Sequence, residues 1–262
     1  MPEKIVTKGI VLRETQTKET DKILTVLTAE HGRLGVIARG ARRKSSRIAA
    51  ASELLAFSEL VLFERRGWYL LDEASTIALW ENVRRDVTLL SLASYFAEMC
   101  EAVTVEDLPA PETLSLLLNM LYALDATDKP HALVKAAFEL KLLSLSGYEP
   151  LVGACAVCGA EAPAEPLFDA EQGVVLCRAC AGAEGRRMLP LDPGALAAMR
   201  HVLGAEKRRM LSFSLRGETQ TRFARACEGF ARCQLDREFR TLDFYKRLAI
   251  PLEPGKTENK QQ

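Results

Sequence analysis

No long apolar segment occurs in this sequence of 262 residues: a run of about 18 uncharged apolar residues is missing, so a transmembrane helix is not expected. The opening Met-Pro-Glu-Lys-Ile-Val also lacks the apolar core of a secretory signal peptide, which favours a location in the cytoplasm. A net charge is missing too, because 35 basic side chains balance 35 acidic ones. The length allows one large domain or a few small ones.

Signatures of several enzyme classes are also missing. The sequence has no G-x-x-x-x-G-K-[ST] phosphate-binding loop, so ATP-driven motion is not expected. The histidines His31, His131 and His201 lie far apart in the chain, and none stands beside a nucleophile motif. Clustered carboxylates of the nuclease type are not evident either. The sequence therefore predicts a protein that binds rather than catalyses.

Charge is distributed unevenly along the chain. Residues 1–47 contain eleven Lys and Arg against five Asp and Glu, residues 48–199 contain ten against twenty-two, and residues 200–247 contain twelve against six. Two basic ends thus flank an acidic middle. A polyanion such as nucleic acid would be bound by the ends, because a concentrated positive field in a neutral protein usually serves such a ligand.

The most basic stretch lies between residues 33 and 47, where six positive side chains occur without a negative one. Its second half, Ala41-Arg-Arg-Lys-Ser-Ser-Arg47, has no large apolar residue and is predicted to be a solvated loop. We expect contacts with phosphates, since the planar guanidinium fork grips phosphate oxygens in pairs. The candidate DNA-binding residues are Arg33, Arg39, Arg42, Arg43, Lys44 and Arg47. The alternative is a loop that is merely solvated.

The first 80 residues are predicted to form β-strands. Short runs rich in Val, Ile, Leu and Thr, separated by turn signals, lie at 4–13, 22–28, 33–39, 54–65 and 68–80. Five such strands without room for crossover helices fit a small Greek-key barrel, either an OB-fold or an SH3-like barrel. Trp68 follows Gly67 near a predicted hairpin tip, so we favour it for base stacking over Phe57, Phe63 and Tyr69. A place in the barrel core is the alternative for each of these aromatics.

Helical spacing of apolar residues begins at residue 81 and predicts three helices before residue 150. Asp192 and Pro193 are predicted to start a further helix over 195–203. The longest remaining segment, 218–239, would place three arginines within an arc of about 80° if it is one helix. These residues, Arg222, Arg225 and Arg232, are a second candidate DNA-binding surface. An ordinary solvated face is the alternative.

Four of the seven cysteines form two Cys-x2-Cys pairs, Cys155 with Cys158 and Cys177 with Cys180, which are separated by eighteen residues. This spacing matches a four-thiolate zinc site, and a predicted hairpin between the pairs would bring them together. Because four thiolates leave no position open for a catalytic water, we expect one structural Zn²⁺ per chain. A disulfide, a redox dithiol or a vestigial site are the alternatives. The other cysteines, Cys100, Cys227 and Cys233, are predicted to be small buried apolar residues.

Three N-terminal motifs resemble the opening of a known family: Thr7-Lys-Gly-Ile-Val-Leu-Arg13, Glu19-Thr-Asp-Lys-Ile-Leu24 and Ala38-Arg-Gly-Ala-Arg-Arg-Lys-Ser-Ser-Arg47. The segment Phe138-Glu-Leu-Lys-Leu-Leu-Ser-Leu-Ser-Gly147-Tyr is similar to the central helix of the same family, and the two cysteine pairs follow it as they do in many members. The family is the RecO family of bacterial DNA repair. The resemblance spans nearly the whole chain.

This resemblance implies an N-terminal OB-fold, binding of single- and double-stranded DNA, and annealing of complementary strands without nucleotide hydrolysis. It also implies action with RecR, and in some bacteria RecF, to load the RecA recombinase onto DNA coated by single-strand-binding protein. Such a protein would work at the bacterial nucleoid. Because the family has a partner groove among its helices, we expect an apolar groove rimmed by Lys135 and Lys141 to accept the acidic, apolar tail of single-strand-binding protein.

The predicted fold is α+β with several domains. An OB-fold nucleic-acid-binding domain at 1–80 precedes an α-helical domain at 81–150 and 188–250, a zinc-binding insertion lies at 151–187, and a disordered tail at 251–262. The leading functional prediction is a DNA-annealing recombination mediator. Two alternatives are a zinc-ribbon and OB-fold factor that binds RNA or the ribosome, and a protein-only scaffold whose basic ends are incidental.

Overall fold

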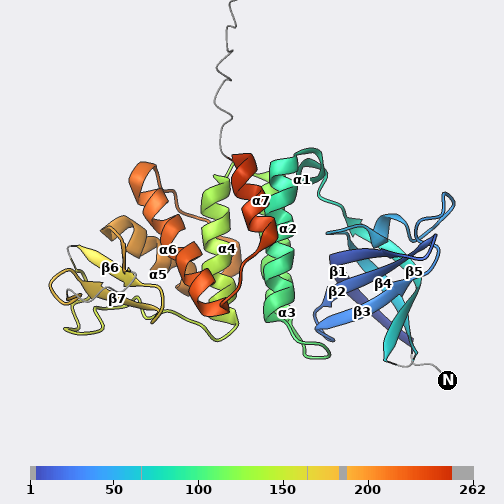
Figure 1. The fold of residues 1–262 in the computed structure, drawn as a ribbon, viewed down its shortest axis with the longest axis horizontal. Coiled ribbons are helices and arrows are strands. Elements are labelled where there is room, and N and C mark those ends of the chain that lie inside the picture. The colour runs from blue at the N-terminus through green and yellow to red at the C-terminus, as the bar shows by residue number, and fades with distance from the viewer. Residues whose placement is uncertain (1–3, 66, 164, 183–187, 250–262) are drawn as a thin grey trace, which may run out of the picture.

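The computed structural model describes residues 4–65, 67–163, 165–182 and 188–249. Three parts follow one another along its longest axis: a β-barrel at one end, a bundle of helices in the centre and a small sheet at the other end (Figure 1). This arrangement confirms the predicted α+β class with an N-terminal barrel. The predicted tail at 251–262 lies outside the described residues.

The barrel is closed, with strands in the order β1-β2-β3-β5-β4. β3 and β5 are parallel, and β1 closes the barrel by pairing antiparallel with β4, which is the OB-fold arrangement rather than the SH3-like one. The strands are β1 (Lys4–Thr17), β2 (Asp21–Thr28), β3 (Arg33–Ala38), β4 (Phe57–Arg65) and β5 (Trp68–Ala78). β1 extends past its predicted end at residue 13, because residues 13–17 pair with β2 across the turn.

Strand β1 takes part in two cores. The barrel core includes Leu24, Val26, Leu34 and Val36, which alternate along β2 and β3. Val11 belongs to that core, whereas its neighbours Ile10 and Leu12 belong to the apolar cluster that fills the helical bundle. Because successive side chains of a strand point to opposite faces, β1 joins the barrel to the helices.

Most helices occur where the apolar spacing predicts them; the short helix over 81–85 was not predicted, and the segment 218–239 differs from the prediction. Within the described residues they are α1 (Glu81–Arg85), α2 (Val87–Val103), α3 (Pro111–Ala126), α4 (His131–Leu145), α5 (Pro193–Gly204), α6 (Gly217–Leu235) and α7 (Arg240–Ala249), with short 3-10 turns η1 (Ala50–Ser52) and η2 (Lys207–Arg209). Asp192 caps α5 by accepting a hydrogen bond from the backbone N–H of Ala195 at 2.8 Å. This confirms the predicted start of that helix.

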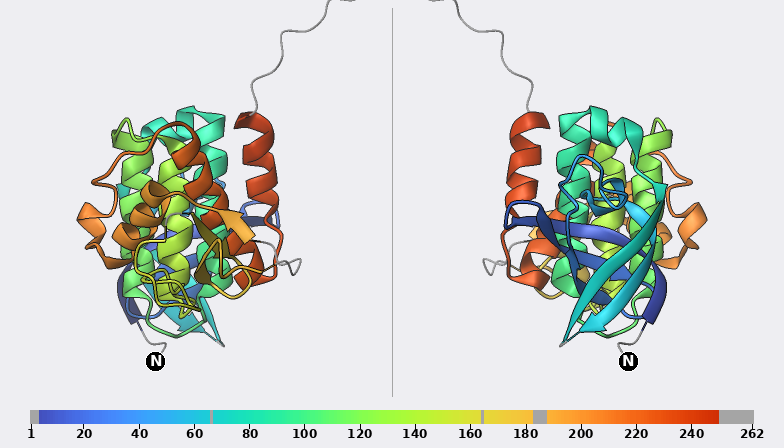
Figure 2. Two further views of the ribbon diagram at one scale, coloured as in Figure 1. Left: turned by 90° about the vertical axis from the view of Figure 1, so that its left-hand side faces the viewer. Right: turned by 90° about the vertical axis from the view of Figure 1, so that its right-hand side faces the viewer.

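The segment 218–239, predicted to be helical, is helical only up to residue 235, so the condition of a single helix over its whole length is not met. α6 ends at Leu235, and Asp236 has a left-handed φ of 42° that stops the helix. After a short turn Phe239 is buried edge-on against Tyr95 of α2, with ring centroids 5.4 Å apart. This contact leads the chain into α7, which lies along α2 (Figure 1). Seen from either end, α7 stands at the outer edge of the bundle (Figure 2).

The small sheet contains β6 (Pro166–Asp169), β7 (Val174–Cys177) and β8 (Met188–Pro190), in the order β7-β6-β8. The antiparallel β6–β7 hairpin confirms the hairpin predicted between the cysteine pairs, whereas the third strand was not predicted. β8 attaches the sheet to the bundle. Leu189 lies so close to Gly229 of α6 that a Cβ on this glycine would come within 2.7 Å of Leu189 Cδ1.

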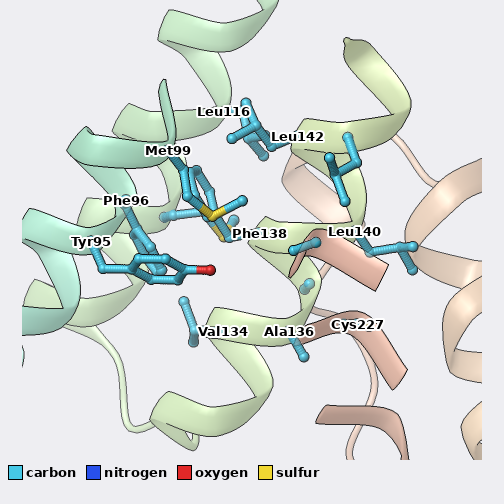
Figure 3. Packing of buried hydrophobic residues seen from close by; sticks show 14 of the residues in the cluster. Tyr95, Phe96, Met99, Leu116, Val134, Ala136, Phe138, Leu140, Leu142 and Cys227 are labelled. Carbon is cyan, nitrogen blue, oxygen red and sulfur yellow. The ribbon is translucent and has the colours of Figure 1, made fainter. Parts of the chain in front are cut away.

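Helix α4 is the centre of the bundle, and its residues are buried on nearly every side. Phe138 of α4 stacks on Phe96 of α2 with ring centroids 4.1 Å apart (Figure 3). Leu140 and Leu142 are fully buried towards the neighbouring helices. α4 therefore packs as a core helix, so its polar residues lie inside the protein unless they are at its ends.

A polar network is buried in this core. Lys135 of α4 is only 5 % exposed, and its Nζ lies 2.7 Å from Glu139 Oε1 and 2.9 Å from Glu228 Oε2. Tyr95 donates a hydrogen bond of 2.7 Å to the same Glu139 oxygen, and Lys246 of α7 pairs with Glu228. Burial raises the pKa of the Glu139 carboxyl, and the ammonium of Lys135 opposes that shift. The network connects α2, α4, α6 and α7.

Replacing Lys135 by alanine should lower the free energy of unfolding by about 3–5 kcal/mol, because Glu139 would remain as an unpaired buried carboxylate. The control Arg85→Ala breaks an exposed pair with Glu81 and should cost less than about 1 kcal/mol. Urea denaturation followed by circular dichroism measures both. The double variant Lys135→Met/Glu139→Leu should recover much of the loss. Equal losses for Lys135→Ala and Arg85→Ala would contradict the role of the network.

Candidate nucleic-acid interface and metal centre

The basic loop, which comprises residues 39–47, follows β3 and is held against the β1–β2 turn. The backbone N–H of Gly40 donates to Asp21 Oδ1 at 2.8 Å, and this glycine has a φ of +64° that other residues rarely adopt. The same hydrogen bond lowers the pKa of Asp21. Arg42 donates from its backbone to Thr20 O at 2.9 Å and from its guanidinium to Glu19 O at 3.1 Å. The first part of the loop is therefore ordered while its cations stay exposed.

A hollow of about 990 Å³, the barrel cleft, separates the basic loop from β4 and β5. Its charged lining consists of Arg39, Arg43, Arg47 and Arg65 with Glu64 and Asp72. Arg42 and Lys44 of the loop are exposed but lie outside the cleft lining. Phe63 and Leu70 line the side opposite the loop. The cleft thus has a cationic side and a partly apolar side, the combination that suits phosphates and bases of a nucleic acid.

Trp68 lies beside the cleft on the outer surface of the barrel. It is 44 % exposed, and its indole rests on β3, where a Cβ on Gly35 would come within 3.3 Å of the ring. Leu70, two residues later on the same face of β5, lines the cleft. Phe57 packs against the helical core and Tyr69 against the barrel core. Trp68 is therefore exposed on the face of the barrel where OB-folds bind oligonucleotides.

Arg33 lies apart from the other cations of its stretch. Its guanidinium donates to the backbone oxygen of Glu101 at 2.6 Å and lies 3.8 Å from Glu106 Oε1. Arg13 of β1 pairs with the side chain of the same Glu101 at 3.0 Å. Both arginines thus connect the barrel to α2, and the phosphate contact of Arg33 stays a prediction.

A second hollow of about 1050 Å³, the helical cleft, lies along α6. Its charged lining consists of Arg225, Arg232, Arg237 and Lys246 with Glu228, Asp236 and Glu238. Two of the four cations belong to α6 and were predicted together; the other two follow the unpredicted helix break. Arg222, the third predicted arginine, lies outside this lining, with its Nε 3.2 Å from Glu218 Oε1. The structure therefore brings two of the three predicted arginines together.

The groove predicted between Lys135 and Lys141 is wrong for Lys135, which is buried in the core network and so cannot rim a surface groove. Lys141 donates to Leu203 O at 2.6 Å and lines a smaller hollow of about 560 Å³ beside Lys207 and Arg208. The error arose because a lysine on an amphipathic helix is usually solvated. Glu139 is recognisable as a neighbour four residues later on the same helix, but Glu228 of α6 is not, and the sequence does not show that the pair is buried.

The four cysteines of the two pairs meet at one point. Their Sγ atoms lie within 4.8 Å of one another, and Cys158 Sγ is 3.5 Å from Cys177 Sγ. A tetrahedral ion with metal–sulfur bonds of about 2.3 Å requires sulfur separations of about 3.8 Å, so the cluster fits one metal ion. Hydrogen bonding from the backbone of Cys158 lowers the pKa of Cys155 to about 6, while contact with the Cys158 thiol raises that of Cys177 to about 12. Ionising all four thiols together therefore needs a cation among them.

Arg200 of α5 holds the first cysteine pair against the bundle. Its guanidinium donates to backbone oxygens on both sides of that pair: Val152 at 2.7 Å, Gly153 at 2.8 Å and Glu161 at 2.7 Å. Within the pair, the backbone N–H of Gly159 donates to Cys155 O at 2.9 Å, and Gly159 has a φ of +73°. Sequence reasoning missed Arg200, because no local signal on α5 marks it as a partner of these carbonyls.

Two family models match the chain: one described as Recombination protein O N terminal, over residues 1–80, and one described as Recombination protein O C terminal, over residues 84–243. The chain belongs to the RecO family. The barrel cleft lies within the match to the N-terminal RecO model. The cysteine cluster and, except for Lys246, the lining of the helical cleft lie within the match to the C-terminal one.

Several proteins named DNA repair protein RecO are similar to this chain. The one from Acetivibrio thermocellus is 30 % identical over 242 residues, which are 92 % of this chain and 96 % of that protein. The one from Symbiobacterium thermophilum is 33 % identical over 239 residues, 90 % of this chain and 94 % of that protein. The one from Anaeromyxobacter sp. (strain K) is 38 % identical over 194 residues, 73 % and 76 % of the two chains. Among the described residues of this RecO-family chain, no helix is both long and apolar enough to cross a membrane.

Elemental analysis of the purified protein should find about one metal ion per chain, because the four thiols form a single closed site. Cys177→Ser should abolish binding, since one ligand from the second pair is lost, whereas Cys233→Ser should leave it unchanged. Removing the ion with a chelator should lower the melting temperature, because the ion links two turns that share little apolar core. A melting temperature that does not respond to the chelator would contradict a structural role.

Proposed function

We propose that this protein is a DNA repair protein that binds DNA in its barrel cleft and anneals complementary strands as a recombination mediator, without an enzymatic step. The observation that carries the proposal is the barrel cleft, where arginines of the basic loop face an apolar side next to an exposed tryptophan. The relatives that match the chain are named as DNA repair proteins, which supports the same conclusion.

Phosphate binding is assigned to the cations in and beside the cleft: Arg39, Arg42, Arg43, Lys44, Arg47 and Arg65. Each single-strand phosphate that they neutralise contributes about −0.7 to the slope of log K against log salt, so four to six contacts give a slope of about −3 to −4. Glu64 and Asp72 lie on the side opposite the loop and repel phosphates. The backbone of the strand therefore follows the loop, and its bases turn towards Leu70 and Trp68.

Annealing requires that two strands, or two parts of one strand, be bound at once. Arg225 and Arg232 in the helical cleft, with Arg222 on the same helix, supply a second cationic surface. The barrel and the bundle share apolar core residues, so the two surfaces keep a fixed relation. Base pairing between the strands then provides the free energy, which agrees with the missing phosphate-binding loop.

The partners follow from the family. We propose that the protein acts at the nucleoid in the cytoplasm with RecR and, where present, RecF, to load RecA onto DNA coated by single-strand-binding protein. With Lys135 buried, the acidic tail of that protein is assigned to the hollow that contains Lys141, Lys207 and Arg208. The functional units are the barrel at 1–80, the helical domain at 81–150 and 188–250, and the cysteine insertion at 151–187.

We assign Zn²⁺ to the cysteine cluster, because a closed set of four thiolates suits zinc. The ligands are Cys155, Cys158, Cys177 and Cys180. When bound, the ion cross-links the two turns. The cluster belongs to the small sheet, at the end of the molecule opposite the barrel (Figure 1), so its role in DNA binding is structural.

Neutralising the basic loop tests the proposed function. The variant Arg39→Gln/Arg42→Gln/Arg43→Gln/Lys44→Gln should bind single-stranded DNA much more weakly at low salt, with a salt slope shallower by about 2 to 3, at about 0.7 per lost contact. Fluorescence anisotropy at several salt concentrations measures both quantities. A matched variant loses four cations outside the cleft, Arg85, Lys129, Arg208 and Arg209, and should keep the wild-type slope. DNA binding that survives in the loop variant, or a wild-type protein that anneals only RNA, would refute the proposal.

Trp68→Ala should weaken binding of single-stranded DNA by about 1–3 kcal/mol, the usual contribution of stacking between a base and an aromatic ring. Trp68→Phe should retain much of the affinity. The chain has one other tryptophan, Trp80, which lies where the barrel meets the helices and whose indole N–H donates to Leu55 O at 3.0 Å. Tryptophan fluorescence should therefore be quenched by DNA in the wild type and unaffected in Trp68→Phe. Persistent quenching in that variant would show that Trp68 does not stack on bases.

A further inference from the structure

A fourth hollow, of about 600 Å³, lies where the barrel meets the helices, and we call it the junction hollow. Arg13 of β1 and Arg240 at the start of α7 line it. Arg237, in the turn before α7, lines both the junction hollow and the helical cleft. The two hollows therefore meet at Arg237 and extend from the barrel to α6. None of these three arginines belongs to the barrel cleft.

The surface of these hollows is more positive than their net charge indicates. In three ion pairs the side chain of the cation is more exposed than that of the carboxylate. The exposed fractions of cation and carboxylate are 59 % and 22 % for Arg13 with Glu101, 50 % and 21 % for Arg237 with Glu98, and 40 % and 19 % for Lys246 with Glu228. The third carboxylate of the junction hollow, Glu14, lies 2.7 Å from Nζ of the buried Lys22. At these three pairs a ligand therefore meets a guanidinium or ammonium group before it meets the carboxylate, whereas Glu14 is more exposed than its partner Lys22.

Two of the arginines are ready to accept a ligand. Arg240 is exposed and has no partner among the residues that the structure describes. The guanidinium carbon of Arg237 lies 5.6 Å from the centroid of the Phe239 ring, and its Nη2 lies 3.8 Å from Glu98 Oε1. Thr241 donates to the same carboxylate, so Glu98 does not depend on Arg237 alone. Arg237 is thus held in position without being fully neutralised.

Two carboxylates oppose an anion at this point. Asp236 and Glu238 flank Arg237 in the turn, are exposed, and line the helical cleft. They are absent from the lining of the junction hollow. Repulsion from them should weaken binding where the two hollows meet, and removing their charge should strengthen it.

We propose that a single strand of nucleic acid continues from the barrel onto α6 along these two hollows. Arg13, Arg240 and Arg237 contact its phosphates in the junction hollow, and the cations of the helical cleft continue the path. The proposal rests on the proposed DNA-binding function and adds a route for strands that are longer than the site on the barrel. Recognition is independent of base sequence, because the contacts are made by a row of cations to the phosphate backbone.

Comparing the binding of a short and a long oligomer distinguishes this route from the barrel site. One OB-fold covers about 4–16 nucleotides, so we compare oligothymidylates of about 10 and about 40 nucleotides by fluorescence anisotropy. Arg237→Gln/Arg240→Gln should bind the short oligomer as the wild type does, whereas its salt slope for the long one should be shallower by about 1.4, at about 0.7 per lost contact. Arg240→Gln alone, which breaks no ion pair among the described residues, should give about half of that change. Asp236→Asn/Glu238→Gln should tighten binding of the long oligomer only.

The matched control is Arg209→Gln/Arg216→Gln, which removes two exposed arginines outside both hollows and should change the binding of neither oligomer. Wild-type affinity and slope of Arg237→Gln/Arg240→Gln for the long oligomer would overturn the route and leave the barrel site standing. The route would also be overturned if Arg237→Gln/Arg240→Gln lost the same affinity for both oligomers, or if the control lost as much affinity for the long oligomer. In either case the total charge of the protein, rather than a path along the two hollows, would explain binding. If the wild type binds neither oligomer, the proposed function itself fails.

Discussion

The apolar seam between β1 and the helical bundle fixes the barrel in place, and the surfaces that could bind DNA depend on it. Ile10 and Leu12 enter the core of the bundle while Val11, between them, stays in the core of the barrel. Two hydrogen bonds reinforce the seam: Arg33 to the backbone oxygen of Glu101 at 2.6 Å, and the Trp80 indole N–H to Leu55 O at 3.0 Å. Because a large apolar interface restricts relative motion of domains, this seam limits how far the barrel cleft and the helical cleft can move apart.

The placement of carboxylates explains how a chain without net charge presents cationic surfaces. Glu139 is taken into the core with a lysine, and Glu98 and Glu101 lie beneath more exposed arginines. Burying an acidic group in this way costs free energy unless a cation accompanies it, and here the cation occupies the outer position. The net charge of the chain therefore does not determine the electrostatic potential near its surface. At these sites the more exposed partner of each pair decides it. In other pairs, such as Lys22 with Glu14 and Lys207 with Glu112, the carboxylate is the more exposed partner, so the effect is local.

The features that could be predicted from the sequence have local signals. The turn at Gly67 and the two Cys-x2-Cys pairs are recognisable within a few residues, so the barrel strands and the cysteine cluster were predicted. The break at Asp236 was not, because an aspartate is common on helices and the cause, burial of Phe239 against the bundle, is a tertiary contact. Lys135 was misplaced for a similar reason. One of its partners lies one turn away on its own helix and the other on α6, which no spacing rule connects to α4.

The close packing of Leu189 of β8 against Gly229 of α6 connects the small sheet to the helical cleft. Met188 and Leu189 of β8 form part of the wall of the helical cleft, and the missing Cβ at position 229 lets the strand approach the helix to its limit. The thiol cluster holds the β6–β7 hairpin together, and β8 pairs with β6. An ion bound by these cysteines would therefore reach the wall of the helical cleft through the pairing of β7, β6 and β8, although none of the four cysteines lines that cleft.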